Sequence, residues 1–407
     1  MNRRGFIALA STTVLAGTPR RVRAAGAPIR IGAINPYSGG PALYGDETTR
    51  GYELAASVLN AKGGIGGRTV EIVRGNAGNP QEAMAAVEQL SGRDKVDAFI
   101  GTYISAVSNA ASEAALNNGK LYWDTNALAT QLTDRGLPNF VRSGPNSNDF
   151  AAMSVTAVVE LISKGLNIAP KDLKVWVQYE DSIYGSTIGK EQQEGLRHAG
   201  VQIVGTSAYS ARAIDQTDVI LRARNAAPDV WMNTGYTADS NLMLRTARDQ
   251  GFKPKAMLIT GASDTFETRD ALGAPFLEGI LVVTYPRPDI NPAYGPGAAD
   301  YLAAYKAKFN RDPIAPQNFT AFVGAQMMFE AIAAAGSPEF EAVRAAAAKM
   351  DKPLGSYANG FGVKFDAKMQ NTRAKPIIGQ WQNGTPVTVF PSEAVPQGGT
   401  LVAMDRK

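Results

Sequence analysis

Hydrophobic positions along the chain follow two spacings, one typical of buried strands and the other of helices. Residues 29–34, 70–73 and 96–100 are short apolar runs, which predict strands inside a sheet. Between the first two runs, apolar residues recur three and four positions apart. This spacing predicts a helix that begins with Asp46 as its N-cap and ends at Gly63.

The same alternation continues to about residue 260. Strands that alternate with helices indicate a mostly parallel sheet covered by helices on its faces. Because 407 residues suffice for two cores, and a second series begins near residue 148, we expect two α/β lobes side by side. The further predicted strands are 121–123, 173–177, 201–204, 230–232 and 257–259, and the further helices are 80–90, 109–117, 151–164, 218–225 and 240–250.

The pattern changes after Tyr285, where four prolines within eleven residues predict a loop that crosses between the lobes. Two helical patterns follow, at 298–309 and 319–335, and an extended tail ends the chain. We expect residues 28–147 plus 286–350 to form the first lobe. Residues 148–285 plus 351–407 are expected to form the second.

The first 24 residues have the pattern of a cleavable export signal. Arg3 and Arg4 precede a short apolar stretch, and small residues suited to cleavage follow at 22–24. The paired arginines resemble a twin-arginine signal, and an ordinary secretory signal is the alternative. The whole chain has 41 basic and 37 acidic residues and a net charge of +4. Removing this segment removes five arginines, which leaves 36 basic residues and a net charge of −1.

Composition excludes several kinds of chemistry. There is no cysteine, hence no disulfide, thiolate metal site or lipidated cysteine, and the one histidine, His198, argues against a Ser-His-Asp triad. The glycine-rich stretch at 63–67 lacks the pattern of a dinucleotide loop, and residues 101–105 lack the Gly-Lys-Ser/Thr of a phosphate loop. We therefore expect no cofactor and no metal. With the basicity confined to the signal, nucleic acid is not an expected partner. No later apolar run approaches the ~20 residues needed to cross a membrane.

In open parallel sheets, ligands bind beyond the carboxyl ends of the strands, so the loops there hold the candidate residues. Ser105 lies just before a predicted helix, where a hydroxyl and free N–H groups suit a carboxylate. Tyr184 and Tyr236 stand beside glycines on turns, where their rings can stack on a ligand. The alternatives are a turn serine without a ligand and tyrosines on the lobe surface.

The chain contains a set of short motifs, which are Ile31-Gly32, Tyr37-Ser38-Gly39, Tyr44-Gly45, residues 60–67, Tyr184-Gly185, Gly235-Tyr236 and Glu278-Gly279. Together these motifs resemble bacterial leucine/isoleucine/valine-binding proteins, the periplasmic receptors of ABC importers. The resemblance implies a type I periplasmic-binding-protein fold, in which two Rossmann-like lobes are joined by three crossovers. It also implies a small-molecule solute, an inner-membrane permease with a cytoplasmic ATPase, and a free periplasmic monomer.

The resemblance also implies site residues. Ser105 matches the serine that helps to bind the ligand carboxylate, and Asn126 matches a position whose backbone oxygen accepts the ligand amine. Leu128 and Ala262 depart from the pattern, because the family has a hydroxyl residue and an ammonium-binding glutamate there. Asp124 or Asp264 could replace that glutamate. The aromatic positions are matched by Tyr44, Tyr103, Tyr184, Tyr236 and Phe322.

We therefore expect a non-enzymatic receptor whose lobes close around a small solute. Without a glutamate for an ammonium group, the ligand stays open among a branched-chain amino acid, a small amide, and an aliphatic or aromatic carboxylate. Tyr103 also resembles the amide- and urea-binding branch of the family. A ligand-sensing subunit of a signalling receptor is the first alternative function, and an exported α/β enzyme is the second.

Overall fold

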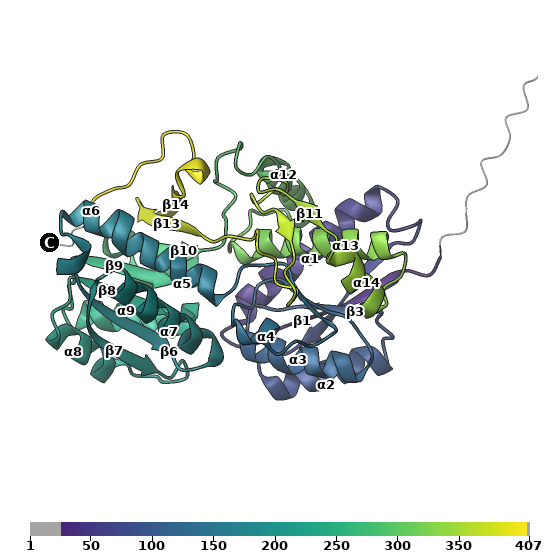
Figure 1. Cartoon of the computed structure of the whole chain (residues 1–407), viewed down its shortest axis with the longest axis horizontal. Helices are drawn as coiled ribbons and strands as arrows, with labels where there is room; N and C mark the ends of the chain where they lie inside the picture. The colour runs from purple at the N-terminus through teal and green to yellow at the C-terminus, as the bar shows by residue number, and fades with distance from the viewer. Residues whose placement is uncertain (1–25, 405–407) are drawn as a thin grey trace, which may run out of the picture.

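The computed structural model describes residues 26–404, which form two lobes side by side (Figure 1). The first lobe is built on a five-stranded sheet in which every pairing is parallel. The second is built on a seven-stranded sheet, in which four pairings are parallel and the two pairings of β13 are antiparallel. The α/β prediction of two parallel-sheet lobes is confirmed.

Strand order explains where each lobe places its loops. The first sheet has the order β2 (Val70–Asn76), β1 (Ile29–Asn35), β3 (Ala98–Gly101), β4 (Tyr122–Asp124), β5 (Phe140–Arg142). The second has the order β14 (Thr385–Phe390), β13 (Ile377–Gln382), β10 (Leu281–Thr284), β9 (Ala256–Thr260), β8 (Val230–Thr234), β6 (Lys174–Glu180), β7 (Gln202–Tyr209). Neighbours that are not consecutive in sequence require crossover connections, and the helices supply them.

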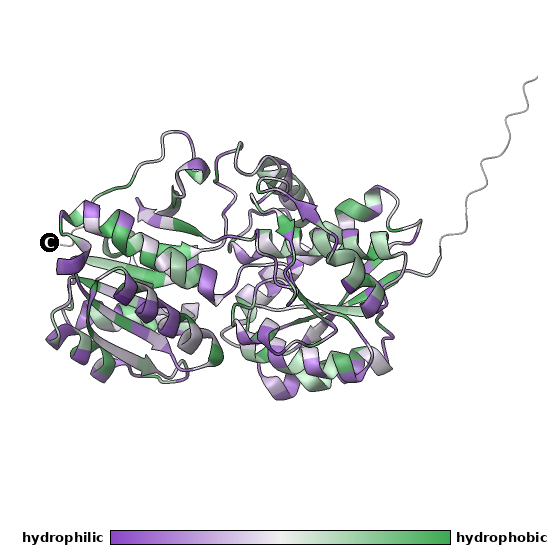
Figure 2. Cartoon of the chain, viewed as in Figure 1, coloured by the Kyte–Doolittle hydropathy of each residue, from purple (hydrophilic) through white to green (hydrophobic). Residues whose placement is uncertain are grey.

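Helices cover both faces of each sheet, and hydrophobic residues gather on the strands between them (Figure 2). The first lobe has α1 (Ala42–Ala61), α2 (Pro80–Gly92), α3 (Ser105–Asn117), α4 (Gln131–Asp134), α12 (Ala298–Phe309), α13 (Gln317–Ala335) and α14 (Phe340–Ala347). The second has α5 (Ser147–Thr156), a π-helical continuation (Ala157–Ile162), α6 (Ser163–Leu166), α7 (Ile183–His198), α8 (Thr217–Asn225), α9 (Thr237–Asp249), α10 (Phe266–Leu272) and α11 (Ala274–Leu277). Short 3-10 turns lie at Pro170–Asp172 and Ser392–Ala394.

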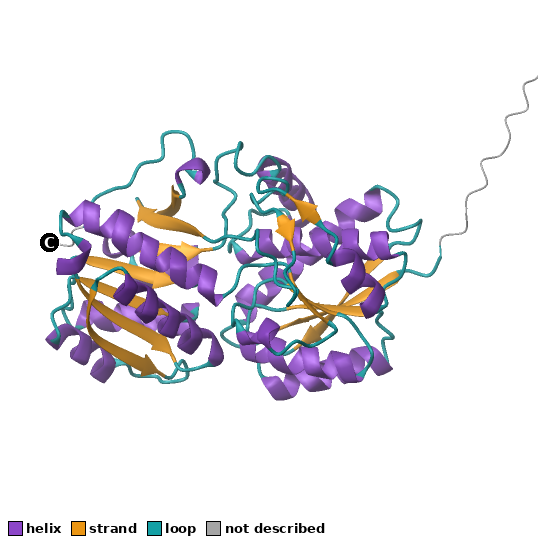
Figure 3. Ribbon diagram, in the orientation of Figure 1, coloured by secondary structure: helices purple, strands orange, loops and turns teal. Residues whose placement is uncertain are grey.

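Three connections of the described chain cross between the lobes (Figure 3). They are residues 143–146, residues 285–297, and residues 365–376. The first and third run together. The amide of Arg142 donates to the carbonyl of Met369 at 2.9 Å, and the amide of Asn371 donates to the carbonyl of Arg142 at 2.9 Å. Two crossings are thereby joined by backbone hydrogen bonds.

The C-terminal part of the chain leaves the first lobe later than expected. After α14, a two-stranded ribbon of β11 (Asp351–Lys352) and β12 (Val363–Lys364) precedes β13. Phe361, Phe365 and Met369 are buried in the same hydrophobic cluster as α1 and α13 of the first lobe. The return to the second lobe therefore begins at β13, rather than at residue 351, because these apolar side chains pack on the first sheet.

Two helices of the first lobe begin earlier than the sequence pattern predicted. The N-cap of α1 is Pro41, so the prediction of Asp46 is wrong. Proline restricts φ to a value near that of a helix, which suits a helix start directly after glycine. Asp46 instead forms exposed ion pairs with Arg50 and Arg74, both at 2.8 Å. Likewise α3 begins at Ser105, four residues before the predicted start.

Other expectations concern export and chemistry. The predicted signal segment, residues 1–24, lies outside the described residues. Within residues 26–404, no single helix has both the length and the apolar composition of a membrane span. Helices α13 and α14 have that length and composition only when taken together, and they are bent by 108° relative to each other. In the same part of the chain, no group of three or more metal-ligating side chains is assembled.

A buried cation fixes the junction of the two lobes. The guanidinium of Arg142 is fully buried and donates to the carbonyls of Ala127 at 3.2 Å and Ala129 at 2.7 Å. It also donates to Oγ1 of Thr133 at 3.2 Å and to Oε1 of Gln370 at 2.5 Å. One side chain thus connects the loop after β4 with the third crossing.

Replacing this guanidinium is expected to destabilise the whole fold. Arg142→Met leaves the carbonyls of Ala127 and Ala129 without their donor, and each buried acceptor left unpaired costs about 1–3 kcal/mol. Chemical denaturation measures the loss. Arg222→Met, on the exposed face of α8, is the matched control and should change the unfolding free energy by less than about 0.5 kcal/mol. Equal effects of the two substitutions would contradict the role of Arg142.

Candidate ligand-binding site

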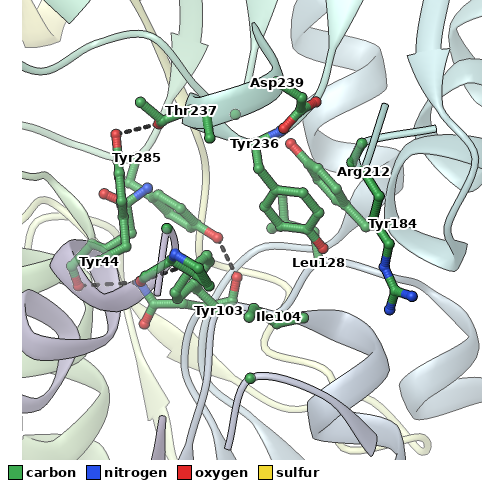
Figure 4. Close-up of a pocket in the computed structure, with 18 residues that line it drawn as sticks. Tyr44, Tyr103, Ile104, Leu128, Tyr184, Arg212, Tyr236, Thr237, Asp239 and Tyr285 are labelled. Carbon is green, nitrogen blue, oxygen red and sulfur yellow. Dashed lines mark hydrogen bonds between the residues drawn. The ribbon is translucent and has the colours of Figure 1, made fainter. Parts of the chain in front are cut away.

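A cavity of about 320 Å³ lies between the lobes, at the carboxyl ends of both sets of parallel strands (Figure 4). The loops after β1, β2, β3 and β4 line it from the first lobe, and those after β6, β7, β8, β9 and β10 line it from the second. This is the position at which open parallel sheets bind ligands. Its size lies near the lower end of the roughly 300–1,000 Å³ found for small-molecule pockets.

Tyrosine rings dominate the lining, and they form a series that continues from one lobe to the other. The ring centroids of Tyr44 and Tyr103 are 5.7 Å apart, and those of Tyr103 and Tyr236 are 6.2 Å apart. Tyr184 lies 4.9 Å from Tyr236. Tyr285, at the start of the second crossing, is the fifth tyrosine in the wall.

Most of these hydroxyls are already used by the protein. Tyr103 donates to the carbonyl of Pro41 at 2.9 Å, and Tyr184 donates to that of Gly235 at 3.2 Å. Tyr285 donates to the backbone carbonyl of Asn126. Burial raises the pKa of all three phenols well above the usual value, so they are neutral. The tyrosines therefore offer ring surfaces to the cavity more than hydrogen-bond donors.

The two lobes touch beside the cavity. Oγ1 of Thr237 donates to the hydroxyl of Tyr44 at 2.5 Å, which joins the start of α9 to α1. Oγ1 of Thr187 donates to Oε1 of Gln131 at 2.9 Å, which joins α7 to α4. In this structure the lobes are thus held together by contacts that a separation of the lobes would break.

Asp239 is the one acidic residue among those that line the cavity, and it acts as part of a helix cap. Its carboxylate accepts hydrogen bonds from the amide of Tyr236 at 3.1 Å and from the hydroxyl of Tyr209 at 2.6 Å. Burial raises the pKa of this carboxyl to about 7, a shift that the nearby Glu180 carboxylate increases and the Tyr209 hydrogen bond opposes. Near neutral pH, Asp239 therefore carries only part of a negative charge.

Positive potential reaches the cavity from helix ends and from one side chain. Pro41, Ile104 and Tyr236 line the cavity and are the N-cap residues of α1, α3 and α9. The first N–H groups of a helix favour an anion. Arg212 is the only basic residue in the lining; it is exposed, and no carboxylate of residues 26–404 lies within ion-pair distance of it.

Six of the ten residues expected at the site line this cavity, and four do not. The six are Tyr44, Tyr103, Asn126, Leu128, Tyr184 and Tyr236. The backbone oxygen of Asn126, expected to accept a ligand amine, already accepts the Tyr285 hydroxyl. Leu128 packs its side chain into the core of the second lobe.

The other four expected residues lie in the surrounding structure. Ser105 is fully buried, and its Oγ accepts the amide of Ala129 at 3.2 Å, so it holds the loop after β4. Phe322 packs against Tyr301 in the core of the first lobe, with ring centroids 5.2 Å apart. Ala262 is buried in the core of the second lobe.

The two aspartates considered as replacements for a ligand-binding glutamate are also engaged elsewhere. Asp264 lines a separate, smaller cavity, and its Oδ2 accepts a hydrogen bond from Oγ1 of Thr284 at 2.5 Å. Asp124 accepts the hydroxyl of Ser108 and the amide of Ala127. Neither residue lines the cavity between the lobes, because both carboxylates are turned toward their own lobe's polar network.

Several lining residues were missed by the sequence reasoning. Arg212 was missed because β7 continues to Tyr209, five residues beyond the predicted end of that strand, which moves the loop that follows it. Tyr285 was missed because β10, directly before it, was not predicted. Asp239 lies in the first turn of α9, which begins three residues before the predicted start. A search of every residue after each strand, with the strands extended, would have found all three.

Comparison with known proteins agrees with this architecture. The periplasmic binding protein family matches residues 28–385. Leu/Ile/Val-binding protein homolog 7 of Brucella suis biovar 1 (strain 1330) is 36% identical over 390 residues, which cover 96% of this chain and 97% of that protein. The chain belongs to the periplasmic binding protein family and is of the Leu/Ile/Val-binding type.

Solved structures show the same fold at low sequence identity. A leucine-binding protein from Thermotoga maritima superposes with a TM-score of 0.78 at 22% identity, over 91% of this chain and 100% of that chain. A solute-binding protein of an R. palustris ABC transporter, in complex with 4-hydroxybenzoate, superposes with a TM-score of 0.75 at 18% identity, over 89% and 96%. The type I periplasmic-binding-protein fold expected from the sequence is confirmed, and these relatives are solute-binding proteins.

The raised pKa of Asp239 predicts a pH-dependent stability. The folded state holds a proton at this carboxyl up to about pH 7, whereas an unfolded aspartate releases it near 3.8. Asp239 therefore destabilises the fold increasingly as pH rises between these values. Asp239→Asn keeps an acceptor for the Tyr236 amide and removes the titrating carboxyl. The unfolding free energy of this variant minus that of the wild type should therefore increase from pH 5 to pH 8. Urea denaturation at each pH measures it.

The control for this prediction is Asp249→Asn, on the exposed end of the same helix. Its unfolding free energy relative to wild type should not change over this pH range. A difference between wild type and Asp239→Asn that is the same at pH 5 and pH 8 would show that the carboxyl does not titrate there.

Proposed function

We propose that this chain is the solute receptor of an ABC importer, which captures a small carboxylate-bearing solute or amide and delivers it to a membrane permease with its ATPase. The observation that carries the proposal is the cavity between the lobes, whose tyrosine series includes rings from both. A ligand held by both lobes favours the closed arrangement, because only that arrangement provides all the contacts.

Hinge closure of two domains around a ligand is known behaviour of periplasmic binding proteins. Three crossing segments connect the lobes, and the contacts beside the cavity include two hydrogen bonds and the ring contact of Tyr103 with Tyr236. Opening then costs little more than these contacts and the ligand's own. The permease distinguishes the closed, loaded form from the open, empty form by the relative position of the lobes.

Six of the residues expected from the sequence are proposed to contact the solute: Tyr44, Tyr103, Asn126, Leu128, Tyr184 and Tyr236. The wall supplies helix N-termini and Arg212 for a carboxylate and ring surfaces for an apolar body. The solutes supported by this lining and by the relatives are branched-chain amino acids, small amides, and aliphatic or aromatic carboxylates.

The family also supports a location and a way of working. We propose that the signal in residues 1–24, of the twin-arginine type, exports the chain to the periplasm, where it acts as a free monomer without a lipid anchor. It binds its solute without turnover. The described residues that line the cavity include no histidine and no nucleophile next to a base, which suits a receptor.

Loss of a ring from the tyrosine series should weaken binding and leave the fold intact. A thermal-shift screen of amino acids, amides and aromatic acids identifies the solute first, since a ligand at 100 times its dissociation constant adds about 2.7 kcal/mol of stability. Tyr184→Ala and Tyr236→Ala are each expected to lower its affinity roughly tenfold or more, because each removes a stacking surface. Isothermal titration calorimetry measures this.

Tyr236→Phe is the matched control, since it keeps the ring and removes only the hydroxyl, and it should bind within about threefold of wild type. Circular dichroism checks that all three variants fold. Unchanged affinity in both alanine variants would contradict the site, and a screen in which no solute raises the melting temperature would contradict the receptor function.

A further inference from the structure

The wall of the cavity has an aromatic, apolar centre. Tyr184 and Tyr236 stand between Tyr285 on one side and Arg212 on the other (Figure 4). With hydroxyls that bond to backbone carbonyls, Tyr184 and Tyr285 turn ring surface rather than polar groups to this space. Aromatic rings pack best against the faces and edges of other aromatic rings. The centre of the cavity therefore suits a flat ring better than a branched aliphatic side chain.

One side of the cavity suits an anion. Arg212 lies on the loop after β7, and Figure 4 shows its side chain extending away from Asp239, the one acid of the lining. The guanidinium has no ion-pair partner among residues 26–404. Ile104, the N-cap residue of α3, lies in the same wall, and no side chain caps the start of that helix. Guanidinium groups bind carboxylates through paired hydrogen bonds.

The opposite side suits a hydrogen-bond donor. Asn126 and Gln317 line the cavity and are 1% and 3% exposed, yet Oδ1 of Asn126 and Oε1 of Gln317 have no hydrogen-bond partner. The orientation of the Asn126 amide is fixed, because its Nδ2 donates to the carbonyl of Gln317 at 3.1 Å. Asn126 lies at the Tyr285 side, since its carbonyl accepts that hydroxyl. A buried acceptor without a donor is costly, so a ligand that brings a donor gains affinity.

An α-ammonium group finds no carboxylate in this wall other than that of Asp239. Both oxygens of Asp239 accept hydrogen bonds, from the Tyr236 amide and the Tyr209 hydroxyl. Asp124 and Asp264 lie outside the lining. Burying an ammonium ion without a paired carboxylate is strongly unfavourable. The lining thus disfavours the zwitterionic amino acids that bind to other receptors of this fold.

We propose, on the basis of the receptor function above, that the solute is an aromatic carboxylate with a hydroxyl or amino group on its ring. Its ring packs against the rings of Tyr184 and Tyr236, which touch one another. Its carboxylate meets Arg212, and its ring donor meets Asn126 and Gln317. Arg212 is then a specificity-determining residue of the site, which selects an anion at the end of the ligand opposite to the donor.

Calorimetric titration of the full mature chain with matched probes tests the two ends separately. 4-Hydroxybenzoate should bind roughly tenfold more tightly than 4-fluorobenzoate, which has a similar size but no donor for the buried acceptors. It should also bind roughly tenfold more tightly than 4-hydroxybenzamide, which lacks the negative charge. Leucine, phenylalanine and choline should bind far more weakly than any of these acids.

The variant Arg212→Gln tests the anion end. It should lower the affinity for 4-hydroxybenzoate about tenfold and leave that for 4-hydroxybenzamide unchanged, because only the acid carries the charge. Arg222→Gln, an equally exposed arginine on α8 away from the cavity, should change neither affinity. Equal losses for acid and amide, or no loss for either, would overturn the role of Arg212.

The outcomes separate this inference from the receptor function. If leucine, phenylalanine or choline binds more tightly than 4-hydroxybenzoate, the chain is a receptor and the proposed ligand class is wrong. If 4-fluorobenzoate binds as tightly as 4-hydroxybenzoate, the donor end is wrong. If no amino acid, amide or aromatic acid binds, the receptor function itself is wrong, and the ligand class is wrong with it.

Discussion

Arg142 is a fully buried cation at the junction of the lobes, and the arrangement of the site depends on how its charge is compensated. Two carbonyls of the loop after β4 and two side-chain oxygens surround the guanidinium. An arginine without such partners could not remain charged inside a protein. The loop at 125–129 is therefore held around the guanidinium by its carbonyls, and this position places Asn126 and Leu128 at the cavity. Ser105 fixes the same loop from α3.

The cavity follows from the way two parallel sheets face one another. Each sheet presents the carboxyl ends of its strands and the N-termini of the helices that follow them, so loops and positive helix ends meet between the lobes. The hydroxyls of Tyr103, Tyr184 and Tyr285 donate to backbone carbonyls, which leaves an apolar, aromatic wall in a setting of positive potential. No charged side chain has to be buried to obtain that potential.

The alternation of strands and helices was predictable from the sequence, because buried parallel strands are apolar runs and their helices carry a regular apolar face. The helix at 298–309 has the predicted ends, and Asn79 with Pro80 does begin α2. The ends of other elements were less predictable. β7 is an edge strand with mostly half-exposed residues, so its apolar pattern fades before the strand ends and the loop that holds Arg212 was misplaced.

Residues placed by family resemblance alone show why the site could be predicted only in part. Tyr44 and Tyr184 lie in the first turns of α1 and α7, and Tyr236 is the N-cap of α9, each next to a glycine that marks its position in the sequence. Phe322 lies on a long helix whose faces are nearly all apolar, so nothing in the local pattern distinguishes a side chain that faces the cavity from one that faces the core. The unpartnered oxygens of Asn126 and Gln317 arise from contacts between segments nearly 200 residues apart, which no local pattern contains.

Asn126 both lines the cavity and is bonded to the segments that connect the lobes. Its carbonyl accepts the hydroxyl of Tyr285, the first residue of the second crossing, and its side chain donates to Gln317 at the start of α13. The neighbouring carbonyls belong to Arg142, which precedes the first crossing and is bonded to Gln370 in the third. All three crossings are therefore connected to one short loop. A ligand that bonds to Asn126 contacts the loop to which all three crossings are bonded. The proposed donor end of the ligand is therefore the end whose binding is coupled to closure of the lobes.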